Sequence, residues 1–125
     1  MKKAILSTIL AASFLLAAPT TVCASEVMPM AAPENWISGS SSGHGFTEAW
    51  EASTSEGDAH LTYGFNTLFV DEDYAWADHA TEIHWASIKN GNDEWHLPLL
   101  FSLAGFTSKV EVEHAGTHVY YACEW

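Results

Sequence analysis

The chain has 125 residues, of which 16 are acidic and only four are lysine or arginine, and its formal net charge is −12. A surface with so few cations cannot neutralise the phosphates of a nucleic acid, and it does not adsorb electrostatically to an anionic membrane. Aromatic residues make up 13% of the chain, so the acidity is not accompanied by low hydrophobicity. The composition therefore predicts a folded domain with an acidic surface rather than a disordered segment.

Residues 1–24 have the pattern of a secretory signal peptide. Lys2 and Lys3 precede an apolar stretch over residues 4–18, and residues 22–24 place small side chains before the expected cleavage site. The apolar stretch is too short to span a bilayer. We therefore expect a secreted, extracellular protein of 101 residues, a length that suits one domain.

Residues 25–45 are rich in proline, alanine, glycine and serine, and they predict a flexible arm in front of a β-sandwich domain over residues 46–125. The tract from Gly39 to Gly43 fits the Gly-x-Ser-x-Gly pattern of a nucleophilic serine. That pattern requires a strained turn between a strand and a helix in a much larger α/β sheet. We therefore interpret the tract as part of the linker.

Alternation of apolar and polar residues predicts strands over 46–51, 61–70 and 81–88. In the last of these, His84 and Ile88 are expected on one face and Trp85 on the other. The run 71–73, Asp-Glu-Asp, is interpreted as a solvated end to the preceding strand, because it lacks the spacing of a calcium loop. Asn90 and Gly91 give the strongest short turn signal in the chain.

Residues 95–106 predict an edge strand, because Pro98 does not fit a central strand or a helix interior. Residues 109–114 and 117–123 predict a C-terminal hairpin, with His114 and His118 solvated beside its turn. Short strands without an amphipathic helix favour an all-β fold, a small antiparallel β-sandwich or barrel.

The cysteines indicate a buried thiol. Cys23 leaves with the expected signal peptide, and Cys123 is then the only cysteine. In an exported protein a single cysteine is either buried and inert, which we favour, or it forms an intermolecular disulfide that would make a homodimer.

No motif in the sequence predicts an enzyme, so we expect no catalytic residue, no metal and no cofactor. His79 and His84 are five residues apart, which does not suit a zinc site unless a turn brings them together. Exposed aromatic and histidine side chains near a turn do suit contact with a carbohydrate or a peptide. The candidate binding residues are therefore His79, His84, Trp76 and Trp85, although for Trp85 the sequence favours a place in the core.

Two blocks of residues carry a resemblance to a known family, and the signal peptide and short mature length agree with it. The first block is Tyr74, His79, His84 and Ala86–Ile88, and the second is Gly105, Lys109, Val112, Tyr120, Tyr121 and Trp125. With these residues the sequence resembles the lactococcin 972 family of secreted, unmodified bacteriocins. Two features depart from the family pattern: the strongly acidic charge and the stretch 45–73, which looks like an insertion.

The resemblance implies a small antiparallel β-sandwich and a function. The founding member of the family blocks septum formation by binding the cell-wall precursor lipid II, and producers pair such toxins with an immunity membrane protein and an ABC transporter. We therefore expect a secreted bacteriocin-like antimicrobial that binds, without catalysis, at the envelope of competing Gram-positive bacteria, with lipid II as a candidate target. The alternative is a secreted acidic β-sandwich that serves as a binding or inhibitor module without toxicity.

Overall fold

The structure is a computed structural model and describes residues 33–125. The expected signal peptide, Cys23 and the first part of the expected arm, residues 25–32, lie outside the described residues. Within residues 33–125 the chain forms eight strands and no helix, arranged as two antiparallel four-stranded sheets. The expected all-β fold, a small antiparallel β-sandwich, is therefore confirmed.

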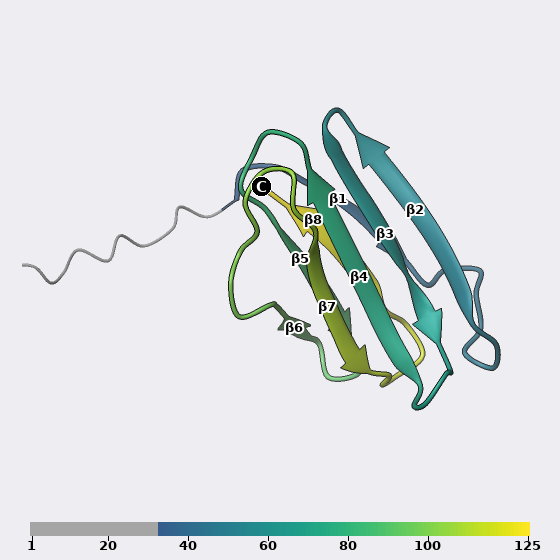
Figure 1. Ribbon diagram of the computed structural model, residues 1–125. Helices are drawn as coiled ribbons and strands as arrows, with labels where there is room; N and C mark the ends of the chain where they lie inside the picture. The colour runs from purple at the N-terminus through teal and green to yellow at the C-terminus, as the bar shows by residue number, and fades with distance from the viewer. Residues whose placement is uncertain (1–32) are drawn as a thin grey trace, which may run out of the picture. The chain divides into compact units, whose positions relative to one another are not determined.

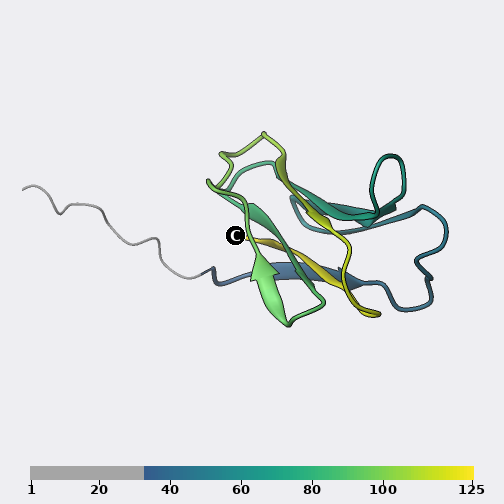
Figure 2. The same cartoon turned by 90° about the horizontal axis from the view of Figure 1, so that it is seen from below.

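Sheet A has the strand order β1-β8-β5-β6 and sheet B has the order β2-β3-β4-β7. Figure 1 shows the strands of the two sheets, and Figure 2 shows the sheets as two facing layers. The strands are β1 (Trp36–Ser40), β2 (Trp50–Glu56), β3 (Ala59–Asn66), β4 (Glu72–His79), β5 (Trp85–Asn90), β6 (Glu94–His96), β7 (Ser108–Glu113) and β8 (Tyr120–Glu124).

β5 follows the alternation expected from the sequence. Ala86 and Ile88 are fully buried between the sheets, whereas Trp85 and Lys89 point to the outside of sheet A. The expected turn after Asn90 is confirmed, because a three-residue loop joins β5 to β6 with Asn90 paired to Glu94. Successive side chains on a strand point to opposite faces, so burial of one face fixes the direction of the other.

The sandwich begins earlier in the chain than the sequence indicated. Residues 36–40 form β1, which pairs with β8 along its whole length, so this part of the expected arm belongs to sheet A. Gly39 lies against the ring of Tyr63, where an added Cβ would be 2.1 Å from the ring. Ser41, the central serine of the Gly-x-Ser-x-Gly match, is buried and its Oγ accepts a hydrogen bond from the N–H of Val119 at 3.0 Å.

The acidic run 71–73 starts a strand rather than ending one. β4 begins at Glu72, and Asp73 is fully buried. β4 is a central strand of sheet B, paired with β3 on one side and β7 on the other. The expectation of a solvated charge run was therefore wrong for Asp73.

β7 and β8 do not form the expected hairpin. β7 pairs with β4 in sheet B, whereas β8 lies between β1 and β5 in sheet A. The loop between them, which contains Gly116 with a φ of 87°, crosses from one sheet to the other. His114 beside this loop is largely buried against Asp73 rather than solvated.

The expected edge strand over residues 95–106 is confirmed only at its start. β6 covers Glu94–His96 at the edge of sheet A, and Pro98 follows it in a loop that continues to residue 107. Ser102 makes an isolated bridge with His84. The loop thus connects β6 at the edge of sheet A to β7 at the edge of sheet B, and it adds no further strand to either sheet.

The core consists mainly of aliphatic side chains and Tyr121, and it includes Cys123, which is fully buried. Burial raises the pKa of the Cys123 thiol to about 12, with Asp78 and Glu124 adding to the effect. A thiol with so high a pKa is almost entirely protonated at neutral pH and reacts slowly. Cys123 therefore behaves as a small apolar core residue, as the sequence favoured.

Candidate functional site

The structure does not bring the four predicted binding residues together. Trp85 lies on the outer face of sheet A and Trp76 on the outer face of sheet B, while His79 and His84 are buried between the sheets. The two histidines were expected to be exposed, and in that respect the expectation was wrong. Only the two tryptophans stand where a ligand in solution can touch them.

His79 and His84 hold the turn between β4 and β5. Their rings lie 6.2 Å apart, so the turn does bring them together. His79 Nδ1 accepts hydrogen bonds from the N–H groups of Thr81 and Glu82, at 3.3 and 3.0 Å. His84 Nδ1 and Nε2 lie 3.0 and 3.1 Å from the carbonyl oxygens of Glu82 and Ala77. The two rings therefore contact backbone groups of the turn and of the end of β4, which is a structural role.

Asp73 forms a second buried polar cluster at the opposite end of β4. Its carboxylate accepts hydrogen bonds from Asn90 Nδ2 at 3.0 Å, from His114 Nδ1 at 3.0 Å and from the Tyr121 hydroxyl at 3.5 Å. Asn90 and Tyr121 belong to sheet A, whereas Asp73 belongs to sheet B. The cluster therefore ties the two sheets together, and it offers no opening to a ligand.

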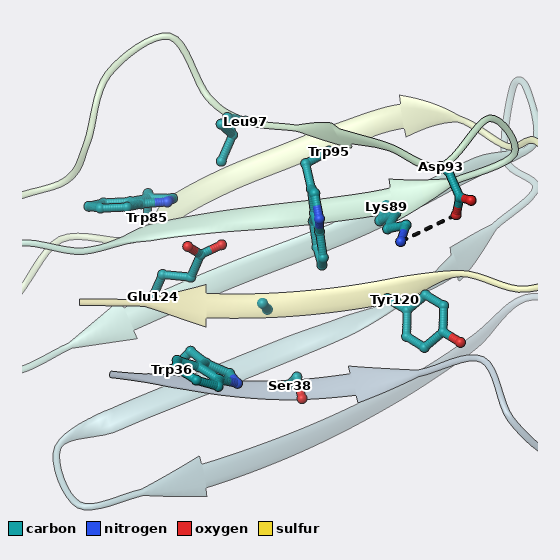
Figure 3. A pocket seen from close by; sticks show the side chains of 10 residues that line it. Trp36, Ser38, Trp85, Lys89, Asp93, Trp95, Leu97, Tyr120 and Glu124 are labelled. Atoms are coloured by element: carbon teal, nitrogen blue, oxygen red, sulfur yellow. Dashed lines mark ion pairs between the residues drawn. The ribbon is translucent and has the colours of Figure 1, made fainter. Parts of the chain in front are cut away.

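The outer face of sheet A carries a groove of about 700 Å³ between exposed aromatic side chains. The residues that line it come from β1, β5, β6, β8 and the loops that follow β5 and β6 (Figure 3). We call it the aromatic groove and define it by its lining: Trp36, Ser38, Trp85, Lys89, Asp93, Trp95, Leu97, Tyr120, Ala122 and Glu124.

The strand register explains the shape of the aromatic groove. Glu124 on β8 is paired with Trp36 on β1 and with Trp85 on β5, so these three residues form one row across the sheet. We call them the Trp–Glu–Trp row. The next row on the same face, two positions along each strand, consists of small side chains: Ser38, Ala122 and Ser87. Ser38 and Ala122 of this row line the floor of the groove, while Ser87 is fully buried beside them, and the larger side chains of the flanking rows stand above the floor.

A second ridge lies beyond the floor. Lys89 on β5 is paired with Tyr120 on β8 and with Trp95 on β6. Its Nζ lies 3.2 Å from Asp93 Oδ1, 5.9 Å from the centroid of the Trp95 ring and 5.8 Å from that of Tyr120. A cation this close to aromatic faces is attracted by their quadrupoles. Lys89 is thus already neutralised and held by its neighbours.

Glu124 differs from Lys89 in its surroundings. Its Oε1 accepts a hydrogen bond from the Ser87 hydroxyl at 2.6 Å, which fixes the carboxylate. Among residues 33–125 the ion pairs are Lys89 with Asp93 and His114 with Asp73, so Glu124 has no cationic partner there. Its charge is available to a ligand in the groove.

Sequence reasoning found Trp85 in this groove and missed Trp36, Trp95, Tyr120 and Glu124. Trp36 was missed because β1 was assigned to the arm, and β8 was placed in a hairpin with β7. The sequence did offer one signal. In the segments 36–40, 85–89 and 120–124, every second residue is first a large side chain, then a small one, and then a large or polar one. Their adjacency in sheet A could not be deduced from that spacing.

Two loops expose apolar side chains outside the groove. Leu99 is 96% exposed in the loop after β6, and Phe69 is 92% exposed in the loop between β3 and β4. The first loop carries no charged residue from Leu97 to Thr107. Leu97 also lines the aromatic groove, so the apolar surface of the groove continues into this loop.

In the part of the chain that the structure describes, no three His, Cys, Asp or Glu side chains are placed to hold a metal ion. The same part contains no helix long and apolar enough to cross a membrane. Comparison of the chain with protein-family models, with curated proteins and with solved structures found no match.

Proposed function

We propose that this protein is a secreted, bacteriocin-like antimicrobial that acts by non-enzymatic binding at the cell envelope of competing Gram-positive bacteria, and that the aromatic groove is its binding surface. The aromatic groove is the observation that carries the binding role. The resemblance to the lactococcin 972 family supports the toxic role. A cell-wall precursor such as lipid II is the candidate target, and a dedicated immunity membrane protein with an ABC transporter would protect the producer.

Two properties of the aromatic groove support a binding role. Trp36 is 64% exposed, and Trp95 and Tyr120 are also exposed, although burying such side chains inside a domain would be favourable. Tryptophan and tyrosine give large contact area at low entropic cost and dominate many interfaces. A concave aromatic surface with a few fixed polar groups is typical of a ligand site.

The charge of the chain restricts how such a target would be held. Lipid II presents a pyrophosphate, which is repelled by an acidic protein whose residues 33–125 contain only two lysines, Lys89 and Lys109. Since Lys89 is paired with Asp93, the aromatic groove is better suited to another part of an envelope molecule, such as its sugar or peptide. Binding would then depend on the rings more than on ion pairs with phosphate.

Growth inhibition tests the proposal directly. Protein purified after expression of the full chain is added to a panel of Gram-positive species, with and without soluble lipid II as a competitor. We expect inhibition, and relief of that inhibition by lipid II would support the target as well. Inhibition that lipid II does not relieve would keep the antimicrobial function and exclude this target.

Binding to isolated cell walls is measured in parallel. Protein that is folded and binds walls but inhibits no species would favour the alternative, a secreted binding or inhibitor module without toxicity. Protein that is folded but neither binds walls nor inhibits growth would exclude the proposed function.

A further inference from the structure

We infer that the Trp–Glu–Trp row, Trp36, Glu124 and Trp85, recognises an organic cation, a primary or quaternary ammonium group carried by the ligand. The inference rests on the proposed role of the aromatic groove as the ligand surface, and it names the chemical group that the groove would take. It is argued from the register of sheet A, the surroundings of Glu124 and the way the chain holds its own lysines.

The register sets the spacing of the two indoles. Trp36 and Trp85 are both paired with Glu124, so they are separated by two strand spacings on the same face of sheet A. Adjacent strands lie about 4.8 Å apart, which places the two tryptophan Cα atoms about 10 Å apart. A cation bound between the two side chains would be within reach of both indoles, since a cation–π attraction is significant within about 6 Å of a ring centroid.

The carboxylate completes the site. In Figure 3 the Glu124 side chain lies between those of Trp36 and Trp85. The Ser87 hydroxyl donates to Oε1 at 2.6 Å, which leaves Oε2 to face a ligand. A fixed carboxylate between two indole side chains is complementary to a cation and repels an anion, and partial burial strengthens the attraction beyond that of an exposed pair.

Both lysines of the described part are held by contact with aromatic rings, the same interaction that we infer for the cation of the ligand. Lys89 Nζ lies beside Asp93 and within 6 Å of Trp95 and Tyr120. Lys109 Nζ lies 4.3 Å from the centroid of the Trp76 ring. Each lysine is therefore held by an aromatic ring, and neither reaches Glu124. The Trp–Glu–Trp row has the same kinds of side chain, with two indoles instead of one, and meets no cation of residues 33–125.

The overall charge favours the same ligand. The chain has 16 acidic residues against four lysines or arginines, and the positive charge of Lys89 in the groove is compensated by Asp93. The potential at the groove is therefore negative, which raises the local concentration of cations and the rate at which they arrive. An ammonium group on an aliphatic stem also gains from contact with the indoles and Leu97.

Two small probes test the inference: choline as a quaternary ammonium, and Nα-acetyl-lysine methylamide as a primary ammonium. The neutral control is the same lysine derivative acetylated on Nε. Binding to the full chain is followed by the NMR signals of the indole N–H groups. We expect at least one cation to bind at millimolar concentration and to shift the Trp36 and Trp85 signals, and the neutral control to bind at least tenfold more weakly.

A matched pair of charge-neutralising variants isolates the carboxylate. Glu124→Gln keeps the shape of the side chain and an oxygen for the Ser87 hydroxyl, and we expect it to weaken cation binding at least tenfold. Glu94→Gln removes the same charge from an exposed position of β6 outside the groove lining, and we expect no change. Equal binding of the neutral control, unchanged binding by Glu124→Gln, or no response to either cation would overturn the inference.

Measuring cell-wall binding by the same proteins separates the inference from the proposed function. If the wild-type protein binds walls and Glu124→Gln binds them equally well, the cation site is wrong and the proposed function stands. If the wild-type protein binds the small cations at the Trp–Glu–Trp row but binds no walls, the cation site stands and the proposed function is wrong.

Discussion

The outer faces of the two sheets contain the same kinds of residue in different states. On sheet B, the Trp76 N–H donates to Glu111 at 3.0 Å and Lys109 lies over the Trp76 ring. The Tyr74 hydroxyl donates to Glu51 at 2.8 Å. On sheet A, the indoles of the aromatic groove flank a carboxylate that has no cationic partner in the described residues.

Composition alone does not distinguish a binding face from a structural one in this protein. Each face has tryptophan, tyrosine, glutamate and lysine, and the register decides which of them meet. On sheet B, Trp76 is paired directly with Lys109, so the aromatic ring and the cation satisfy each other. On sheet A, the row of small residues separates Glu124 from Lys89, and a ligand can enter between them.

The largest expected effect comes from the residue on which both faces depend. Asp73→Ala leaves the donors of Asn90, His114 and Tyr121 without their carboxylate, and we expect the free energy of unfolding to fall by about 3 kcal/mol. Since Asp73 links sheets A and B, both faces should be lost in one cooperative transition. Denaturant unfolding followed by tryptophan fluorescence measures this.

Asp71→Ala is the matched control for that variant. Asp71 is exposed, and its replacement should change the free energy of unfolding by no more than about 0.5 kcal/mol. Equal stability of the two variants would mean that the buried cluster does not hold the sheets together.

β4 was difficult to predict because the fold depends on contacts of Asp73 with residues that are distant in the sequence. An aspartate at a strand start is typical of a solvated turn, and the sequence around Asp73 contains nothing that offsets its burial. The donors that satisfy it lie 17 to 48 residues further along the chain. The alternation of β5, by contrast, was predicted correctly, because it is local and one face of the strand is buried, although the strand begins at Trp85 and not at residue 81.

The candidate site was predictable only in part for a similar reason. Trp85 could be selected from its own neighbourhood, but Trp36 and Glu124 acquire their role through pairing over long separations in the chain. The turn signal between β7 and β8 indicated that the chain reverses, and it could not indicate that the second strand joins the other sheet. Side chains next to each other in a sheet are set by such non-local pairing.

A pair of tryptophan variants tests whether the binding surface lies on sheet A or on sheet B. Trp85→Ala should weaken binding to Gram-positive cell walls at least tenfold, a loss typical of an exposed aromatic anchor, with little change in melting temperature. Trp76→Ala should leave wall binding unchanged and lower the free energy of unfolding by about 1 kcal/mol, because it removes the hydrogen bond to Glu111 and the contact with Lys109. If Trp76→Ala weakened wall binding and Trp85→Ala affected only stability, the binding surface would lie on sheet B.

Alkaline titration tests the buried tyrosines of both sheets, Tyr74 on sheet B and Tyr121 on sheet A. Burial, together with the hydrogen bond and charge of Glu51, raises the pKa of Tyr74 above its ordinary range, and burial beside Asp73 does the same for Tyr121. Above pH 10 the unfolded chain loses these protons while the folded chain keeps them, so the stability of the fold should decrease as the pH rises. Absorbance at the tyrosinate band measures the ionisation, and Glu51→Gln should lower the pKa of Tyr74.

Cys123 gives the internal check on that titration. Its pKa of about 12 in the folded protein exceeds the ordinary value of about 8.5, so its contribution to stability is also lost as the pH rises through this interval. A thiol reagent at pH 8 should therefore modify Cys123 only after denaturation. Rapid modification of the native protein would show that the buried core opens to solvent.

Lys109 is the cation that occupies the Trp76 ring on sheet B, and its removal should have a small effect on stability. If pairing with Lys109 is what closes the face of sheet B, Lys109→Ala should free the Trp76 ring at a cost of about 0.5–1 kcal/mol in stability, the usual strength of an exposed cation–π contact. The variant should then acquire a weak response of the Trp76 indole signal to choline, weaker than that of the aromatic groove because one indole replaces two. A Trp76 signal that still ignores choline would mean that the arrangement of two indoles around one carboxylate, and not the lack of a lysine partner, distinguishes sheet A.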